Sequence, residues 1–152
     1  MPARAVRFGL DTSYLVALLS GWHERHAATL ADYASRRRVR HHPVIPLQAL
    51  LETYSVLTRL PPPFRVPAST AARQLSDTFR DVAEVPETGP ATIWAAIAEF
   101  AGRQITGGAI YDAHIADTVF SAGAELLLTW NLRDMTRVAP PGLTVREPAP
   151  IS

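Results

Sequence analysis

Five oxygen-bearing side chains that could ligate a cation interrupt or directly follow apolar stretches of the sequence. They are Asp11, Glu52, Asp112, Asn131 and Asp134. Burying an isolated carboxylate is unfavourable unless something pairs with it, and several carboxylates in one crevice also repel one another. Mg²⁺ or Mn²⁺ would offset both costs, because these ions prefer oxygen ligands and often bind substrate phosphates. One or two such ions can generate hydroxide and stabilise the leaving oxygen in phosphodiester cleavage.

Each of these side chains also has a purely structural interpretation. Asp11 could cap the helix that follows it, and Asp112 could be a first-turn acid favoured by the helix dipole. Glu52 could lie on a solvated helix flank. Asn131 and Asp134 fit an ordinary turn in "WNLRD". The argument for a site therefore rests on shared placement, which depends on the elements around these residues.

The hydrophobic pattern predicts short strands that alternate with helices. The expected strands are 6–10, a short segment within 39–46, 81–85, 125–130 and 143–148. The expected helices are 13–21, 23–38, 47–60, 68–79, 89–105 and 107–124. Ser13 or Thr12 is the expected N-cap of the first helix, and Pro90 is expected near the first turn of the fifth. The proline-rich segment 61–67 is expected to break the chain between two helices.

This alternation indicates an α/β protein, a three-layer α/β/α sandwich around a central, mostly parallel sheet. In such sheets the ligand crevice lies at the carboxyl ends of the strands. Asp11 and Asn131 both come at predicted strand ends. The fold class therefore predicts that these two residues lie close together.

The composition sets further limits. A chain of 152 residues with 47% apolar residues is expected to form a single domain, 1–152, with a proper core. It has no apolar run of about 18 residues and no signal-peptide pattern at its start, and without cysteine it has neither disulfides nor thiolate metal sites. These features favour a cytoplasmic protein. The net charge of +1 gives no bulk electrostatic sign of a nucleic-acid binder, although all fifteen basic residues are arginine.

Four segments, in this order and spacing, resemble a PIN domain, and more narrowly the VapC-type toxins of bacterial toxin–antitoxin pairs. They are "GLDTSYLVALL", "LQALLETYSVLTRLP", "GGAIYDAHIADTVFSAGAELLLTWNLRDM" and the closing "GLTVREP". The resemblance covers roughly residues 6–148. It implies an α/β/α sandwich that hydrolyses RNA, tRNA among the candidate substrates, with Mg²⁺ or Mn²⁺. It also implies a homodimer neutralised by a cognate VapB-type antitoxin.

The resemblance assigns roles by position. Asp11, Glu52 and Asp112 match the family acids that hold the metal. Asn131 stands where family members commonly have a fourth acid, so this chain departs from the pattern there; an amide oxygen can ligate a metal or orient water but carries no charge. Asp134 is a candidate for the missing carboxylate. Asn131 and Asp134 are thus expected to complete the catalytic set, and one-metal and two-metal chemistry both stay open.

Several other features have weaker interpretations. His23 and His26 are three residues apart, which does not match the four-residue spacing of the H-E-x-x-H zinc motif. A structural role is expected for His114, although it is also the one histidine placed to approach a substrate, just past Asp112. Asp117 lies about 140° round the helix from Asp112 and is expected to be peripheral. The arginines of 36–40 either complement a helix C-terminus on a solvated surface or contact RNA or an acidic antitoxin segment.

Two other functions compete with a ribonuclease. A haloacid-dehalogenase-like phosphatase would use Asp11 as its nucleophile, but that class needs a second aspartate where Ser13 stands, and a lysine, which the chain lacks. The other alternative is a catalytically impaired PIN-like domain that only binds RNA or protein. Asn131 motivates this second alternative. Metal-dependent cleavage abolished by Asp11→Asn would separate the ribonuclease from the binding module.

Overall fold

The computed structural model describes residues 5–152, in which eleven elements alternate along the chain. The strands are β1 (Arg7–Leu10), β2 (His42–Val44), β3 (Leu126–Leu128) and β4 (Thr144–Arg146). The helices are α1 (Thr12–Leu19), α2 (His26–Arg38), α3 (Leu47–Arg59), α4 (Ala68–Phe79), α5 (Pro90–Gly102), α6 (Ala109–Ser121) and α7 (Leu132–Val138). Within these residues no helix is long and apolar enough to cross a membrane.

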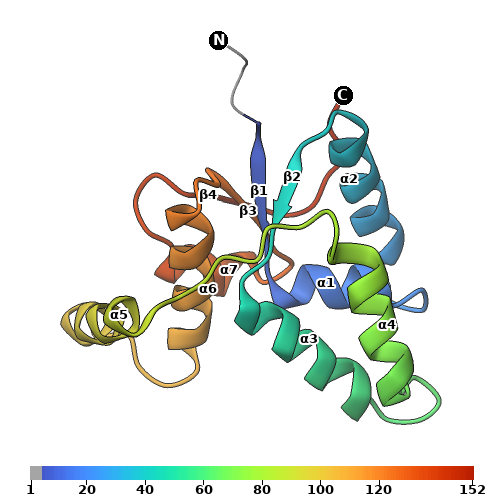
Figure 1. The fold of residues 1–152 in the computed structure, drawn as a ribbon, viewed down its shortest axis with the longest axis horizontal. Helices are drawn as coiled ribbons and strands as arrows, with labels where there is room; N and C mark the ends of the chain where they lie inside the picture. The colour runs from blue at the N-terminus through green and yellow to red at the C-terminus, as the bar shows by residue number, and fades with distance from the viewer. Residues whose placement is uncertain (1–4) are drawn as a thin grey trace.

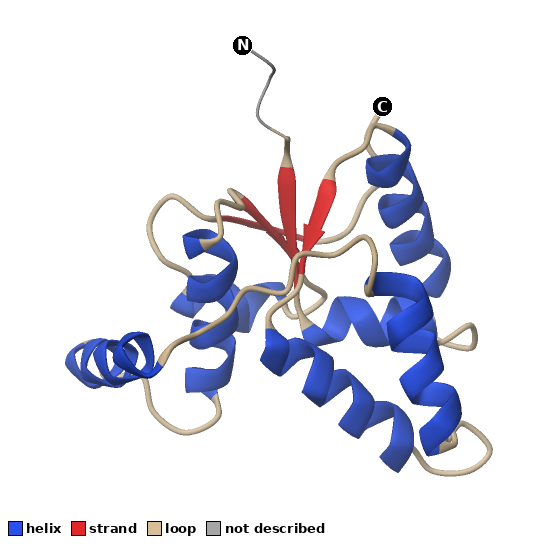
Figure 2. Ribbon diagram, in the orientation of Figure 1, coloured by secondary structure: helices blue, strands red, loops and turns tan. Residues whose placement is uncertain are grey.

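The four strands form one fully parallel sheet in the order β2-β1-β3-β4. Helices cover both sides of it, with α1 to α4 gathered on one side and α5 to α7 on the other (Figure 1). Figure 2 shows the strands as a central layer between these two groups of helices. The α/β/α sandwich with a parallel sheet is therefore confirmed.

The strand register determines which side chains meet at the carboxyl edge of the sheet. Leu10 at the end of β1 pairs with Leu128 at the end of β3. The next residues, Asp11 and Thr129, therefore leave the sheet side by side. In Figure 1, α1 and α3 begin where the β1 and β2 arrows end, so the N-termini of these two helices face the same edge.

Close packing against β1 fixes the position of α6. A Cβ atom on Gly9 would lie 2.8 Å from the Cβ of Val119, so only glycine lets α6 approach the strand this closely. The core on both sides of the sheet is apolar and includes Phe8, Leu10 and Leu127, all fully buried. The helix that carries Asp112 is thus held against the strand that ends at Asp11.

A buried ion pair ties α2 to α1 and to the last described residues. Asp32 accepts hydrogen bonds from Arg36 Nε, at 3.1 Å to each of its oxygens, and from Tyr14 Oη at 2.7 Å. The backbone N–H of Ala149 donates to the same carboxylate at 2.9 Å, and the N–H of Ile151 donates to Ser35 Oγ. The expectation of a solvated surface was therefore wrong for Arg36, because its i, i+4 neighbour Asp32 draws it into the interior.

Three predicted elements differ from those observed. The strand expected at 81–85 reduces to a single bridge between Val44 and Glu84, because Pro86 follows and cannot donate to a sheet. The second helix begins at His26 rather than at 23, since the preceding residues form a turn. The turn expected in "WNLRD" instead opens the short helix α7, which buries Met135 and Val138.

Candidate functional site

A cavity of about 370 Å³ lies at the carboxyl ends of β1 and β3. Its walls come from β1 and α1, from the α1–α2 loop, from α3 and α6, and from the residues after β3. The lining residues are Asp11, Thr12, Ser13, Val16, His23, Glu52, Val56, Asp112, Trp130 and Asn131. Four of the five residues singled out in the sequence therefore meet in one cavity, and the fifth, Asp134, lies outside it.

Asp11 is buried, with 3% of its surface exposed, and accepts three hydrogen bonds. The N–H of Tyr14 and the hydroxyl of Ser13 donate to Oδ1 at 3.0 and 2.7 Å, and the Thr129 hydroxyl donates to Oδ2. Asp11 is thus the N-cap of α1, in place of the expected Thr12 or Ser13. The sequence left open whether Asp11 caps a helix or belongs to a site, and the structure shows that it caps α1 and also lines the cavity.

Burial dominates the electrostatics of Asp11. It raises the pKa of this carboxyl to about 6, against the lowering effect of the hydrogen bonds from Thr129, Tyr14 and Ser13. The charge of Asp112 adds a smaller upward shift to the pKa. Within residues 5–152 no arginine or histidine lies within ion-pair distance of Asp11. The donors around it are therefore all neutral.

Two hydroxyl groups connect the ends of β1 and β3 through hydrogen bonds. Ser13 Oγ accepts the backbone N–H of Trp130, and Thr129 Oγ1 accepts the N–H of Asn131, both at 2.9 Å. The two hydroxyl oxygens are 3.3 Å apart. Thr129 was not predicted from the sequence, although a lone hydroxyl residue at the end of the apolar run "LLLT" is a signal that could have identified it.

Glu52 reaches the cavity from α3 and is half-buried rather than on a solvated flank. Its Oε2 accepts the Thr12 hydroxyl at 2.7 Å, and its Oε1 accepts Gln48 Nε2 at 2.8 Å from one turn earlier in α3. These two donors fix the orientation of the carboxylate. Thr12 thereby links α1 to α3 directly beside Asp11.

Asp112 lies in the first turn of α6, where the helix dipole favours an acid. It is half-buried, and burial is the main cause of its raised pKa. The charges of Glu52 and then Asp134 raise this pKa further. Two carboxyl groups of the cavity thus have raised pKa values, and each is affected by the negative charge of another.

The remaining candidates divide between the cavity and its surroundings. Asn131 lines the cavity, whereas Asp134 is exposed on α7 and lines an adjoining hollow that Asn131 and Trp130 also border. Asp117 and His114 lie elsewhere, in a cavity of about 640 Å³ between α5 and α6. Asp117 is peripheral to the Asp11 site, as expected; burial and the charge of Glu99 raise its pKa to about 6.

The histidine that lines the Asp11 cavity is His23, whereas His114, the one histidine considered for an approach to the substrate, lines the other cavity. His23 lies in the α1–α2 loop, and the path of that loop brings its ring to the cavity wall. The backbone N–H of Arg25 donates to His23 Nδ1 at 3.0 Å. Periodicity could not reveal this placement, because it is the turn before α2 that creates it.

The oxygen-rich, cysteine-free donor set is the kind that Mg²⁺ and Mn²⁺ prefer. In residues 5–152 no group of three or more histidine, aspartate or glutamate side chains is already arranged to hold an ion. Asp11, Glu52 and Asp112 nevertheless line the same cavity, and none of the three forms an ion pair with another residue of 5–152. Their chemistry therefore fits a divalent cation, which would supply the positive charge that these acids lack.

Comparison with known proteins connects this geometry to a family. Residues 9–139 match the PIN domain family. The ribonuclease VapC40 of Mycobacterium tuberculosis is 39% identical over 118 residues, which are 77% of this chain and 81% of that protein. The structure of VapC20 from the same species, described as a sarcin-ricin loop cleaving toxin, has a TM-score of 0.69 at 16% identity and covers 88% of this chain and 96% of its own.

A second solved structure has the same fold. VapBC2 from Rickettsia felis, bound to a DNA fragment from its promoter, has a TM-score of 0.62 at 16% identity and covers 93% of this chain and 98% of that chain. The PIN match includes every residue from Asp11 to Asn131, and the VapC40 match covers more than two thirds of both proteins. The chain therefore belongs to the PIN domain family, and within it to the VapC-type ribonucleases.

Proposed function

We propose that this protein is a toxin that acts as a metal-dependent endoribonuclease and hydrolyses RNA phosphodiester bonds in the Asp11 cavity. One observation carries the proposal: Asp11, Glu52 and Asp112, from three different elements, line one cavity, and none of them forms an ion pair within residues 5–152. The description of the relative VapC40 as a ribonuclease supports the same activity.

Asp11, Glu52 and Asp112 would hold Mg²⁺ or Mn²⁺. Asn131, which lines the same cavity, and Asp134, which lines the adjoining hollow, would complete the set. When bound, the ion supplies a more acidic water and charge stabilisation at the phosphate. The side chains around it keep the ligands in place. Ser13, Thr129 and the Tyr14 N–H orient Asp11, while Thr12 and Gln48 orient Glu52. We assign catalytic roles to Asp11, Glu52, Asp112, Asn131 and Asp134.

The partners follow from the same assignment. We propose RNA as the substrate, with tRNA among the candidates, and a cognate VapB-type antitoxin as the inhibitor. The solved VapBC2 complex of Rickettsia felis supports an antitoxin partner. We further propose that residues 1–152 act as a single PIN domain, as a homodimer and in the cytoplasm.

A second candidate function rests on Asn131. This amide lines the cavity where an acid would add charge, so a cation would be held by fewer carboxylates. A chain with too weak a metal site would bind RNA or a protein partner without cutting it. The two candidates differ in a measurable way, because only the enzyme turns RNA over.

The test compares purified wild type with Asp112→Asn on labelled total RNA, each with Mg²⁺, Mn²⁺ or EDTA. Cleavage by wild type alone, lost in EDTA, is the expected result. The fragment ends would then identify the target. No cleavage under any condition, together with no heat of metal binding by calorimetry, would establish the binding module instead.

A further inference from the structure

The α1–α2 loop carries two neighbouring aromatic rings, and one of them lines the Asp11 cavity. Trp22 is 48% exposed, and the neighbouring His23 lines the cavity itself. Their ring centroids are 5.6 Å apart. Two backbone hydrogen bonds shape the loop, from the N–H of His23 to the carbonyl of Ser20 and from the N–H of His26 to the carbonyl of His23. The exposed indole is thus held on an ordered turn next to His23, a residue of the cavity wall.

The Trp22 ring also contacts a ring from a second segment of the chain. The ring of Phe64, from the proline-rich turn between α3 and α4, lies 4.6 Å from the Trp22 ring, centroid to centroid, with an interplanar angle of 36°. The N–H of Phe64 donates to the carbonyl of Pro61, which fixes that turn. A ring held in this way loses little freedom when a flat ligand stacks on it, so part of the ordering cost of binding is already met.

His23 presents a defined polar atom next to this surface. Its Nδ1 accepts the N–H of Arg25, so in the neutral ring the proton is on Nε2. Nε2–H is then the nitrogen free to donate to a ligand. A hydrogen-bond donor beside a stacking ring suits the edge of a nucleobase, which carries acceptor atoms in its plane.

An arginine side chain lies against Trp130 in the cavity wall. The guanidinium carbon of Arg25 lies 4.6 Å from the centroid of the Trp130 ring, and Trp130 lines the cavity. Trp130 is itself fixed, because its Nε1 donates to Thr29 Oγ1 at 2.9 Å. Arg25 is exposed and therefore accessible to a phosphate. The acids of the cavity repel the RNA backbone, and Arg25 offers the opposite charge at its edge.

We propose that Trp22 and His23 bind a nucleobase of single-stranded RNA next to the scissile phosphate, while Arg25 contacts a flanking phosphate. This inference rests on the proposed ribonuclease function and adds to it a base-binding subsite, which needs an unpaired base because a base in a duplex cannot offer its face to Trp22. The combination of stacking face, in-plane donor and cation, continuous with the acidic cavity, favours a nucleotide over a peptide segment as occupant.

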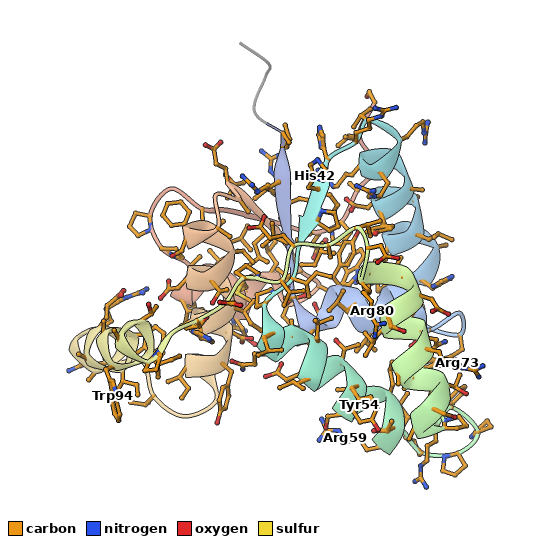
Figure 3. All side chains as sticks on the ribbon, viewed as in Figure 1. His42, Tyr54, Arg59, Arg73, Arg80 and Trp94 are labelled. Carbon is orange, nitrogen blue, oxygen red and sulfur yellow. The ribbon has the colours of Figure 1, made fainter. Side chains whose placement is uncertain are left out.

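The experiment measures binding and cleavage separately. Binding of a short fluorescein-labelled single-stranded RNA, and of its duplex, is followed by anisotropy in the Asp112→Asn background with Mg²⁺, where cleavage does not interfere. The variants are Trp22→Ala, Trp22→Phe and the matched control Trp94→Ala. Trp94 is 71% exposed on α5 and projects away from the rest of the chain (Figure 3), so its loss tests for a general effect of removing a surface tryptophan.

We expect Trp22→Ala to weaken single-strand binding by at least about fivefold, in line with the value of one base–aromatic stack, while Trp22→Phe and Trp94→Ala stay near the parent. The duplex should bind more weakly than the single strand and lose little affinity on Trp22→Ala. In the Asp112-containing protein, Trp22→Ala should lower kcat/KM to a similar extent, and His23→Ala should change the preferred base at the cleavage site.

Each contrary result has a separate meaning. If wild type cleaves RNA but Trp22→Ala binds and cleaves like Trp94→Ala, the base site is wrong and the ribonuclease stands. If Trp22→Ala leaves RNA affinity unchanged but weakens binding of the co-expressed antitoxin, the loop is a protein-docking surface and the proposal is overturned. If wild type with Asp112 intact neither cleaves nor binds RNA, the proposed function fails and this inference fails with it.

Discussion

Asp11 and Asp32 are both buried aspartates, but their charges are balanced in different ways. Asp32 is fully buried, and each of its carboxylate oxygens accepts a hydrogen bond from Arg36 Nε. Arg36 Nη2 also lies 3.1 Å from Asp32 Oδ2. Asp11, 3% exposed, receives hydrogen bonds only from neutral donors. Both carboxylates touch Tyr14, Asp11 through the backbone N–H and Asp32 through the hydroxyl.

The difference distinguishes a structural acid from a functional one. A buried charge that the chain pairs internally contributes to a stable interior as long as both partners remain. A buried carboxyl that meets only neutral donors keeps a raised pKa, as Asp11 does, and gains from any cation that comes from outside. Substitutions at the two positions should therefore affect different properties of the protein.

The largest expected effect is on stability, from Asp32→Asn. The substitution leaves Arg36 buried without its partner and should lower the free energy of unfolding by about 3–5 kcal/mol. Urea denaturation followed by circular dichroism measures it. Pairing the change with Arg36→Met should recover a large part of the loss, and a cost below about 1 kcal/mol for Asp32→Asn alone would show that the ion pair does not hold α2 in place.

Asp11→Asn should have the opposite profile. We expect RNA cleavage to fall by more than about 100-fold, because a ligand charge is lost. In metal-free protein below about pH 5, where the Asp11 carboxyl is largely protonated, the free energy of unfolding should change by less than about 1 kcal/mol, since an amide oxygen still accepts the Tyr14 and Ser13 donors. Cleavage of labelled RNA and urea denaturation of the same preparation test both halves. A variant that unfolds readily would mean that Asp11 is chiefly structural.

The pH dependence of stability should separate the two aspartates in metal-free protein. The pKa of Asp11 is raised to about 6 from an ordinary value of 3.8, so the folded state binds the proton more tightly than the unfolded state. Stability should therefore fall as pH rises from about 4 to about 6, by about 1–3 kcal/mol.

The difference between wild type and Asp11→Asn, measured in EDTA across this range, isolates the contribution of Asp11. Asp117→Asn is the matched control, because the pKa of Asp117 is also raised to about 6 outside the cavity. Added Mg²⁺ should reduce the loss of stability with rising pH that Asp11 causes, and should leave the loss that Asp117 causes unchanged. Equal behaviour of the two variants with Mg²⁺ would argue against a cation beside Asp11.

The smallest expected effect comes from Thr129→Val. The change removes the hydroxyl that donates to Asp11 and accepts the Asn131 N–H, and should cost about 1–2 kcal/mol of stability. Because the Thr129 hydrogen bond lowers the pKa of Asp11, the pH-dependent decline should move to higher pH in this variant. Thr136→Val, at an exposed threonine on α7, is the control for the loss of a hydroxyl. An unchanged decline would mean that Thr129 does not affect the ionisation of Asp11.

The sequence predicted the parallel α/β fold, and it predicted that Asp11, Glu52, Asp112 and Asn131 share a site. Strand ends in a parallel sheet meet at one edge, so their proximity follows from topology. Their catalytic and metal-binding roles stay predictions, as does that of Asp134, which lies outside the cavity.

The features that were missed depend on the path of the chain rather than on periodicity. His23, which was not predicted to belong to the site, lines the cavity because the turn before α2 brings it there, whereas His114 lies in the other cavity. Arg36 is buried because a single i, i+4 partner compensates its charge. Helix α7 is short, and a segment of this length has too few apolar positions to distinguish it from a turn.

The pairing of Leu10 with Leu128 also has a consequence for the order in which the molecule assembles. Asp11 and Thr129 are 118 residues apart in sequence, whereas β1 and β2 are joined by a much shorter connection. Closing the longer loop carries the larger entropic cost, and such distant pairings slow folding. We therefore expect a chain emerging from the ribosome to bury Asp11 beside Thr129 only after β3 has been synthesised. Until then the growing polypeptide carries its acids without the cavity that would bring them together.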